Sequence, residues 1–139
     1  MKRKIKSEYS ISNVQSSMVK EGEFDLKDRL IDYAVRIIRL TEALPNTKAG
    51  THVAGQILRS GTSPAPNYGE ALAAESQADF IHKLKIALKE LRETEIWLKI
   101  IAKAKMVSAP RPFAPLLSET DELSAILFTS IQTAKQRKA

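Results

Sequence analysis

The chain has 139 residues and a formal net charge of +6, and this length is enough for one domain with a buried core. It contains no cysteine, which excludes a disulfide framework and thiolate metal sites. No apolar run approaches the roughly 18 residues of a membrane span, and the basic N-terminus lacks the apolar segment of a secretory signal, so we expect a cytoplasmic protein. Aromatic residues make up only 6% of the chain, which predicts a core of aliphatic side chains.

Residues 1–22 form a basic leader. They mix Lys, Ser, Glu, Asn and Gln with isolated apolar residues and show no sustained period, which predicts disorder. Residues 1–20 carry five cations against one carboxylate, and residues 135–138 add three cations, so residues 21–134 have a net charge of −1. The leader is either a solvated segment or an arm that contacts a polyanion, and residues 137–139 form a basic tail.

Two amphipathic helices are predicted in the first half of the chain. Asp25 is placed to cap a helix over residues 26–43, whose apolar residues recur with the helical period. A second helix is expected over residues 48–73. Pro64 and Pro66 remove backbone donors within it, so we expect a kink or break just before them on a continuous helical axis.

Two more helices are predicted in the second half. Ser76 and a first-turn carboxylate mark the start of the longest one, which runs to about residue 105 without Gly or Pro. A proline-rich connector over residues 107–115 ends it, and the last helix is expected over residues 116–136. Short connections favour antiparallel neighbours, so we predict an all-α, antiparallel up-down-up-down four-helix bundle over residues 23–136, with a flexible N-terminal leader.

A polar row follows the second predicted helix at spacings of three and four. It holds a cation, a hydroxyl, an amide and a carboxylate: Arg59, Ser63, Asn67 and Glu70. The row is either a binding or catalytic groove or a structural network or subunit contact. In the structural interpretation, Arg59 or Asn67 donates to carbonyls that the prolines leave free.

Nothing else in the sequence is typical of an active site. No phosphate-binding loop, nucleophile elbow or paired-carboxylate site appears, and His52 and His82 lie on different predicted helices outside any metal-ligand motif. Glu90 and Glu93 have cations for ordinary surface pairing on their own helix, namely Lys83, Lys89 and Arg92. We therefore predict a non-enzymatic protein without catalytic residues, metal or cofactor.

The longest helix carries a candidate nucleic-acid-binding stripe on a side turned away from its core stripe. The stripe consists of five cations with no carboxylate between them: Lys85, Lys89, Arg92, Lys99 and Lys103. It is either a phosphate-facing surface or a solvated face. Because aromatic residues are lacking there, we expect it to contact the backbone rather than the bases.

Further apolar residues lie outside the core stripes. Ile86, Trp97 and Ile100 lie on the opposite flank of the longest helix, and Phe128 and Leu117 lie similarly on the last one. A small bundle needs one apolar stripe per helix, so a second one indicates a partner surface. We expect self-association through Ile86, Trp97 and Ile100, with Trp97 as the candidate anchor.

One part of the chain carries information about a family. The residues concerned are Arg59-Ser60 with Ser63, then Asn67 and Glu70, then Glu75-Ser76 with Asp79-Phe80, and finally Leu84, Ala87, Glu90, Leu91 and Glu93. They resemble the four-helix bundle proteins first noted as products of intervening sequences in 23S ribosomal RNA genes. The resemblance covers about residues 24–134.

The resemblance implies an antiparallel bundle that assembles into a ring-like homopentamer and has no established enzymatic activity. Relatives of this kind include the accessory protein of diversity-generating retroelements, which looks to bind nucleic acid and a reverse transcriptase. The expected partners are therefore further copies of the chain, RNA or DNA, and a reverse transcriptase. We predict a non-enzymatic, oligomeric, nucleic-acid-binding accessory protein; the alternative is a structural or protein-interaction scaffold that does not bind nucleic acid.

Overall fold

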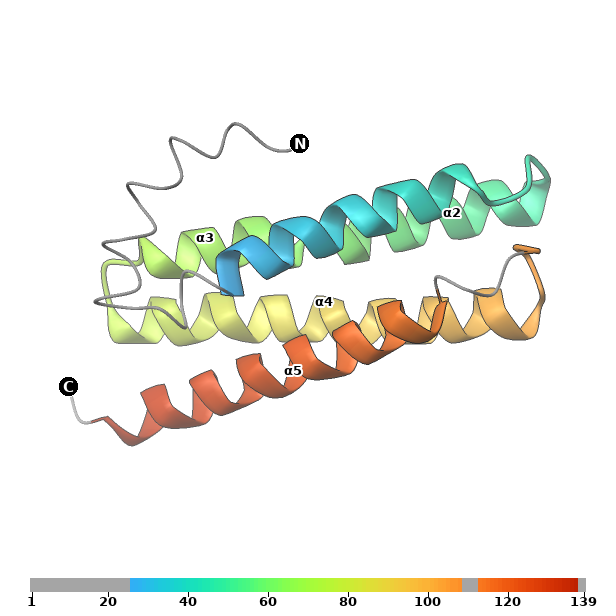
Figure 1. Ribbon diagram of the computed structural model, residues 1–139. Helices are drawn as coiled ribbons and strands as arrows, with labels where there is room; N and C mark the ends of the chain where they lie inside the picture. Colours follow the sequence, from blue (N-terminus) through green and yellow to red (C-terminus); the bar gives the residue numbers. More distant parts are fainter. Residues whose placement is uncertain (1–25, 109–112, 138–139) are drawn as a thin grey trace, which may run out of the picture.

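The computed structural model describes residues 26–108 and 113–137, which form four antiparallel helical rods (Figure 1). The first rod is helical over residues 26–42. The second rod consists of α2 (Lys48–Thr62) and α3 (Pro64–Leu72), the third is α4 (Gln77–Lys103), and the fourth is α5 (Phe113–Gln136). The described residues contain no strand, and the predicted all-α, up-down-up-down bundle is confirmed. The N-terminal leader and the Asp25 cap lie outside the described residues.

The core lies between the rods and is built mainly from aliphatic side chains at helical spacing. On α4 and α5, one buried residue per turn faces inward, and each fully buried Leu or Ile contributes roughly 1.5–3 kcal/mol by leaving water. The largest aliphatic side chains of this core are Leu30, Ile37, Ile57, Leu84, Leu91, Leu98, Ile101, Leu123 and Leu127. The aliphatic core expected from the low aromatic content is therefore present.

Helix starts follow capping chemistry. The Ser76 hydroxyl accepts a hydrogen bond from the backbone N–H of Asp79 at 3.0 Å, as the sequence predicts, and Thr47 accepts one from Gly50 at 3.0 Å. The start of α5 at Phe113 is three residues earlier than predicted. Pro115 is tolerated there because N–H groups in the first turn of a helix have no partner within the helix.

The second rod passes through its two prolines with little interruption. Ser63 separates α2 from α3, yet its φ of −71° and ψ of −33° are helical, and the Asn67 N–H still reaches the Ser63 carbonyl at 3.2 Å. The prediction of a continuous axis with a local disturbance therefore agrees with the structure. The disturbance arises because Pro64 and Pro66 cannot donate to the carbonyls one turn before them.

Hydrogen bonds between buried hydroxyls join the rods in pairs. Tyr33 on the first rod lies 2.6 Å from the Thr120 hydroxyl of α5, and Thr120 in turn donates to the Leu116 carbonyl at 2.8 Å. Burial raises the pKa of Tyr33 to about 12. The hydroxyls of Ser60 on α2 and Thr94 on α4 are 2.8 Å apart. These pairs favour one register between neighbouring rods, since a shift would leave buried hydroxyls without partners.

Gly61 of α2 packs closely against the first rod. A Cβ atom at this position would lie 2.7 Å from Cγ1 and 2.8 Å from Cγ2 of Ile37, which is fully buried. By contrast, a Cβ atom at the exposed Gly55 of the same helix would meet nothing within 4 Å. Gly61 and Gly55 therefore allow the same Gly→Ala substitution to be compared at a packed and at an exposed position of one helix.

We expect Gly61→Ala to lower the free energy of unfolding by about 1–3 kcal/mol, because the added methyl group overpacks the contact with Ile37. Gly55→Ala is expected to raise it by about 0.5–1 kcal/mol through helix propensity alone. Urea unfolding followed by circular dichroism measures both. Equal stabilisation by the two substitutions would contradict the close packing of α2 on the first rod.

Candidate nucleic-acid interface

A groove with a basic lining runs between α4 and α5. Its volume is about 350 Å³, and α4 contributes Lys85, Leu88, Lys89 and Arg92, while α5 contributes Phe128, Ile131, Gln132 and Lys135. Four of these eight residues are cations and none is acidic. On α4 the cations follow at i, i+4 and i+7, so they share one side of the helix over roughly 10 Å of its axis.

The structure divides the predicted basic stripe into two parts. Lys85, Lys89 and Arg92 line the groove, and Lys135 extends this set onto α5. Lys99 forms an ion pair with Glu95 at 3.0 Å, and Lys103 lies in the last turn of α4 outside the groove lining. Glu95 lies beside the stripe rather than between its cations, yet it is close enough to pair with Lys99 from one helical turn before it.

Lys135, Gln132 and Phe128 are groove residues that the sequence analysis did not assign to the stripe. They lie at i+7, i+4 and i on α5 and thus share a helix face. That spacing is visible in the sequence, but the packing of this face beside the cations of α4 is visible only in the fold. The groove also contains an aromatic side chain, contrary to the expectation for the stripe.

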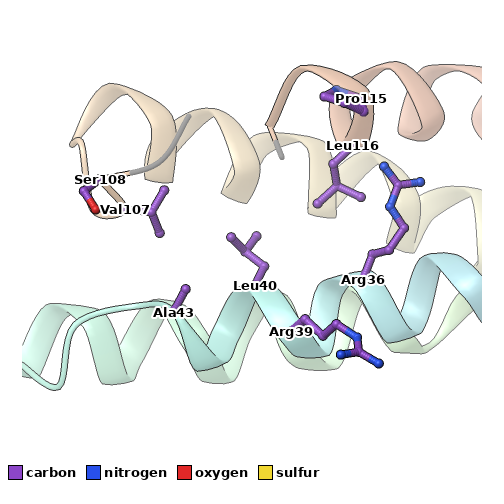
Figure 2. A pocket seen from close by; sticks show the side chains of 8 residues that line it. All are labelled: Arg36, Arg39, Leu40, Ala43, Val107, Ser108, Pro115 and Leu116. Atoms are coloured by element: carbon purple, nitrogen blue, oxygen red, sulfur yellow. The ribbon is translucent and has the colours of Figure 1, made fainter. Parts of the chain in front are cut away.

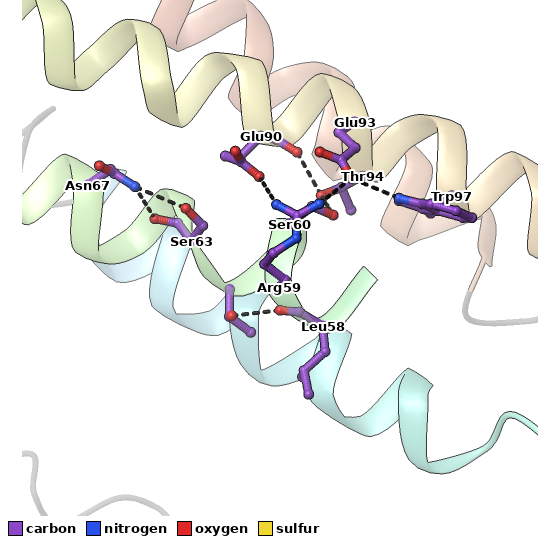
Figure 3. A network of polar contacts seen from close by, with 10 residues as sticks. Leu58, Arg59, Ser60, Ser63, Asn67, Glu90, Glu93, Thr94 and Trp97 are labelled. Carbon is purple, nitrogen blue, oxygen red and sulfur yellow. Dashed lines mark hydrogen bonds and ion pairs between the residues drawn. The ribbon is translucent and has the colours of Figure 1, made fainter. Parts of the chain in front are cut away.

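The polar row of the second rod forms part of a structural network with α4 (Figure 3). Arg59 donates to Glu90 at 3.0 Å and also to Glu93, which accepts a further hydrogen bond from the Trp97 indole at 3.0 Å. The expected pairing of Glu90 and Glu93 with cations of their own helix is therefore corrected. Arg59 comes from the neighbouring rod and bridges both carboxylates in a forked geometry that Lys could not reproduce.

The remaining members of the row also have partners. Asn67 donates to the Ser63 carbonyl at 3.0 Å and lies 2.9 Å from the Ser63 hydroxyl (Figure 3). Glu70 accepts from Lys83 at 2.8 Å, and this hydrogen bond raises the Lys83 pKa. The Ser63 carbonyl also accepts the Asn67 backbone N–H, so it is not one of the carbonyls that Pro64 and Pro66 leave free one turn before them, and donation to a freed carbonyl stays a prediction. These contacts match the structural interpretation of the row.

A second fork joins the first rod to α5. Arg29 donates to Glu119 at 2.7 Å and to Glu122 at 2.6 Å. The hydrogen bond with Glu119 is the main cause that raises the Arg29 pKa, so the guanidinium stays charged. One Arg–Glu–Glu fork thus lies on each side of the bundle, and neither belongs to the basic groove.

The three residues of the predicted oligomer face differ in exposure. Ile100 is exposed, Ile86 is half-buried, and Trp97 is half-buried against the core with its ring edge-on to His52 at 6.1 Å. Other large apolar side chains are also exposed, including Ile31 and Ile38, whose helical spacing had favoured the core side of the first rod. Ile31, Val35 and Ile38 share one face of the first rod at i, i+4 and i+7, and Ile96 adjoins Ile100 on α4.

A hollow of about 390 Å³ lies at one end of the bundle (Figure 2). Its lining comes from the first rod, the segment after α4 and the start of α5, and includes Arg36, Arg39, Leu40, Val107 and Leu116. It is mainly apolar.

Two findings concern metal binding and membrane insertion. Within residues 26–108 and 113–137, no three His, Cys, Asp or Glu side chains gather as a metal site would need. In the same residues, every helix is too short or too polar to cross a lipid bilayer. His52 and His82 stay apart on α2 and α4. The cytoplasmic location remains a prediction.

The four rods, the aliphatic core and the two Arg–Glu–Glu forks define a four-helix bundle protein with a basic groove on one side. Comparison with known proteins identifies its family. The chain belongs to the 23S rRNA-intervening sequence protein family, whose model matches residues 11–129. The resemblance noted in the sequence is thereby confirmed.

A solved structure has the same fold. It is a crystal structure of a protein of unknown function from the S23 ribosomal protein family of Bacteroides thetaiotaomicron, 39% identical to this chain, with a TM-score of 0.71. The match covers 76% of this chain and 97% of that one. No curated protein matches the chain.

Proposed function

We propose that the protein is a non-enzymatic accessory protein that binds the phosphate backbone of RNA or DNA in the groove between α4 and α5. The observation that carries the proposal is the lining of this groove, where Lys85, Lys89 and Arg92 of α4 meet Lys135 of α5 without any acidic residue. Four cations converging from two helices bind phosphates by charge and release condensed counterions, which favours nucleic acid over smaller anions.

Other observations support the same proposal. The described part of the chain has a net charge of +3, from 15 Lys and Arg against 12 Asp and Glu, and four of these cations gather in the groove, which gives it a local positive field. The polar row, the alternative place for chemistry, has its polar groups engaged in contacts between or within helices. The names of the family and of the related structure also refer to ribosomal RNA and to a ribosomal protein family.

The test is binding of a fluorescein-labelled oligonucleotide by the purified full-length protein at stepped salt concentrations, measured by fluorescence anisotropy. Four phosphate contacts predict that the logarithm of the binding constant falls with the logarithm of salt concentration at a slope of about −3. No binding at low salt would contradict the proposal and favour the alternative, a scaffold that does not bind nucleic acid.

We further propose that the protein acts as a homo-oligomer. Large apolar side chains are exposed on every rod, and on two of them they form groups at helical spacing, with Ile31, Val35 and Ile38 on the first rod and Ile96 and Ile100 on α4. Two separate apolar faces are what a ring needs, because each copy must present one face to each neighbour. The homopentamer follows from the resemblance alone, and the expected contact with a reverse transcriptase likewise stays a prediction.

A further inference from the structure

Phe128 is an exposed aromatic side chain within the basic groove. It is 49% exposed, and it is the only large apolar residue of α5 that is exposed in the described part of the chain. The cations Lys85, Lys89 and Arg92 line the groove from α4, and Lys135 lies two turns further along α5 on the same face. A phenyl ring has neither a charge nor a hydrogen-bond donor for a phosphate group, so phosphate binding by the cations does not explain why Phe128 is exposed here.

The combination of an exposed ring with cations matches the chemistry of an unpaired nucleotide. Its phosphates carry the negative charge that the lysines and the arginine attract, and its base offers a flat π-face on which an aromatic ring stacks. In a duplex, both faces of each internal base are already stacked on neighbouring base pairs. Phe128 therefore has a partner in a single strand and none along a duplex.

We propose that the groove selects single-stranded nucleic acid, with Phe128 stacking on one unpaired base while the four cations hold the neighbouring phosphates. Gln132, one turn after Phe128 in the same lining, offers an amide donor and acceptor beside the stacked base. This inference rests on the proposed function and adds strand selectivity to it. It also differs from the sequence expectation of contacts to the backbone alone.

The experiment compares the full-length protein with Phe128→Ala and Phe128→Trp. Each variant is titrated into a labelled single strand and into the same strand annealed to its full complement as a blunt-ended duplex, and inorganic polyphosphate serves as a polyanion without bases. Phe128 is half exposed, so both variants keep the core intact, and circular dichroism and light scattering check the fold and the mass.

Phe128→Ala is expected to weaken binding of the single strand by about tenfold, the effect of losing one base–aromatic stack. Duplex and polyphosphate binding should change by less than about twofold, and Phe128→Trp should retain single-strand affinity. An equal loss for single strand and duplex, no loss at all, or a changed mass of the Ala variant would overturn the stacking role. The proposed function would survive these outcomes, whereas absence of any nucleic-acid binding by the parent protein would overturn both.

Discussion

Replacing Lys85, Lys89 and Arg92 together by Glu is expected to weaken nucleic-acid binding by about 100-fold at 0.1 M salt. The substitutions remove three of the four cations that line the groove. For a single strand, the loss of three phosphate contacts reduces the magnitude of the salt slope by about 2, from about −3 to about −1. At 0.1 M salt, this change in slope corresponds to a binding constant about 100-fold smaller. Repulsion by the new carboxylates adds to the loss.

The fold should survive this triple substitution, because all three side chains are exposed and none forms an ion pair within the described residues. The matched control reverses three exposed cations outside the groove, namely Lys27, Arg39 and Lys48. Both variants have the same net charge. If the control lost as much affinity as the groove variant, binding would depend on overall charge and the groove assignment would be wrong.

The double substitution Ile31→Glu and Ile38→Glu is expected to reduce the protein from an oligomer to a single chain. These side chains are 44% and 40% exposed, so the bundle itself gains no buried charge. At a subunit contact, the same carboxylates would have to leave water without partners, at a cost of several kcal/mol each. Light scattering coupled to size-exclusion chromatography measures the mass.

Ser118→Glu on the exposed side of α5 serves as the control for a new surface carboxylate. It should leave the mass unchanged. An oligomer of unaltered mass in the double variant would show that this face of the first rod is not a subunit contact, and a parent protein that is already a single chain would contradict the oligomer proposal as a whole.

The rods could be predicted from the sequence because each has a strong helical period with identifiable ends. Leu84, Leu91 and Leu98 repeat at intervals that only a helix brings to one side, and Ser76 marks the start of α4. Helix boundaries near proline are harder to predict. Pro115 was placed in the connector because a proline usually ends a helix, yet within the first turn it costs no hydrogen bond.

The candidate site could be predicted only in part, since periodicity gives the angle of a residue around its helix but not the neighbour that it meets. Lys85, Lys89 and Arg92 were found because they share one helix. Lys135 and Phe128 complete the groove from α5, and they reach the α4 cations, 36 to 50 residues away in sequence, only through the packing of α5 against α4.

The same limit explains why the sequence does not predict the ion pairs between rods. Arg59 was assigned to a polar row on its own rod, whereas it pairs with Glu90 and Glu93 across the interface with α4. The helical period places Trp97 outside the core stripe, but it does not show that the indole donates to Glu93 and that the ring lies edge-on to His52 within the chain. Each of these contacts depends on lateral packing, which a one-dimensional pattern does not specify.

The most direct test of the groove assignment locates the bound nucleic acid on the protein. A single strand that contains a photoreactive base is cross-linked to the full-length protein by ultraviolet light, and the modified peptides are identified by mass spectrometry. The groove predicts cross-links within residues 85–92 and 128–135, with Phe128 as the main site. Cross-links confined to residues 1–20, or to the first rod and α2, would contradict binding in the groove between α4 and α5.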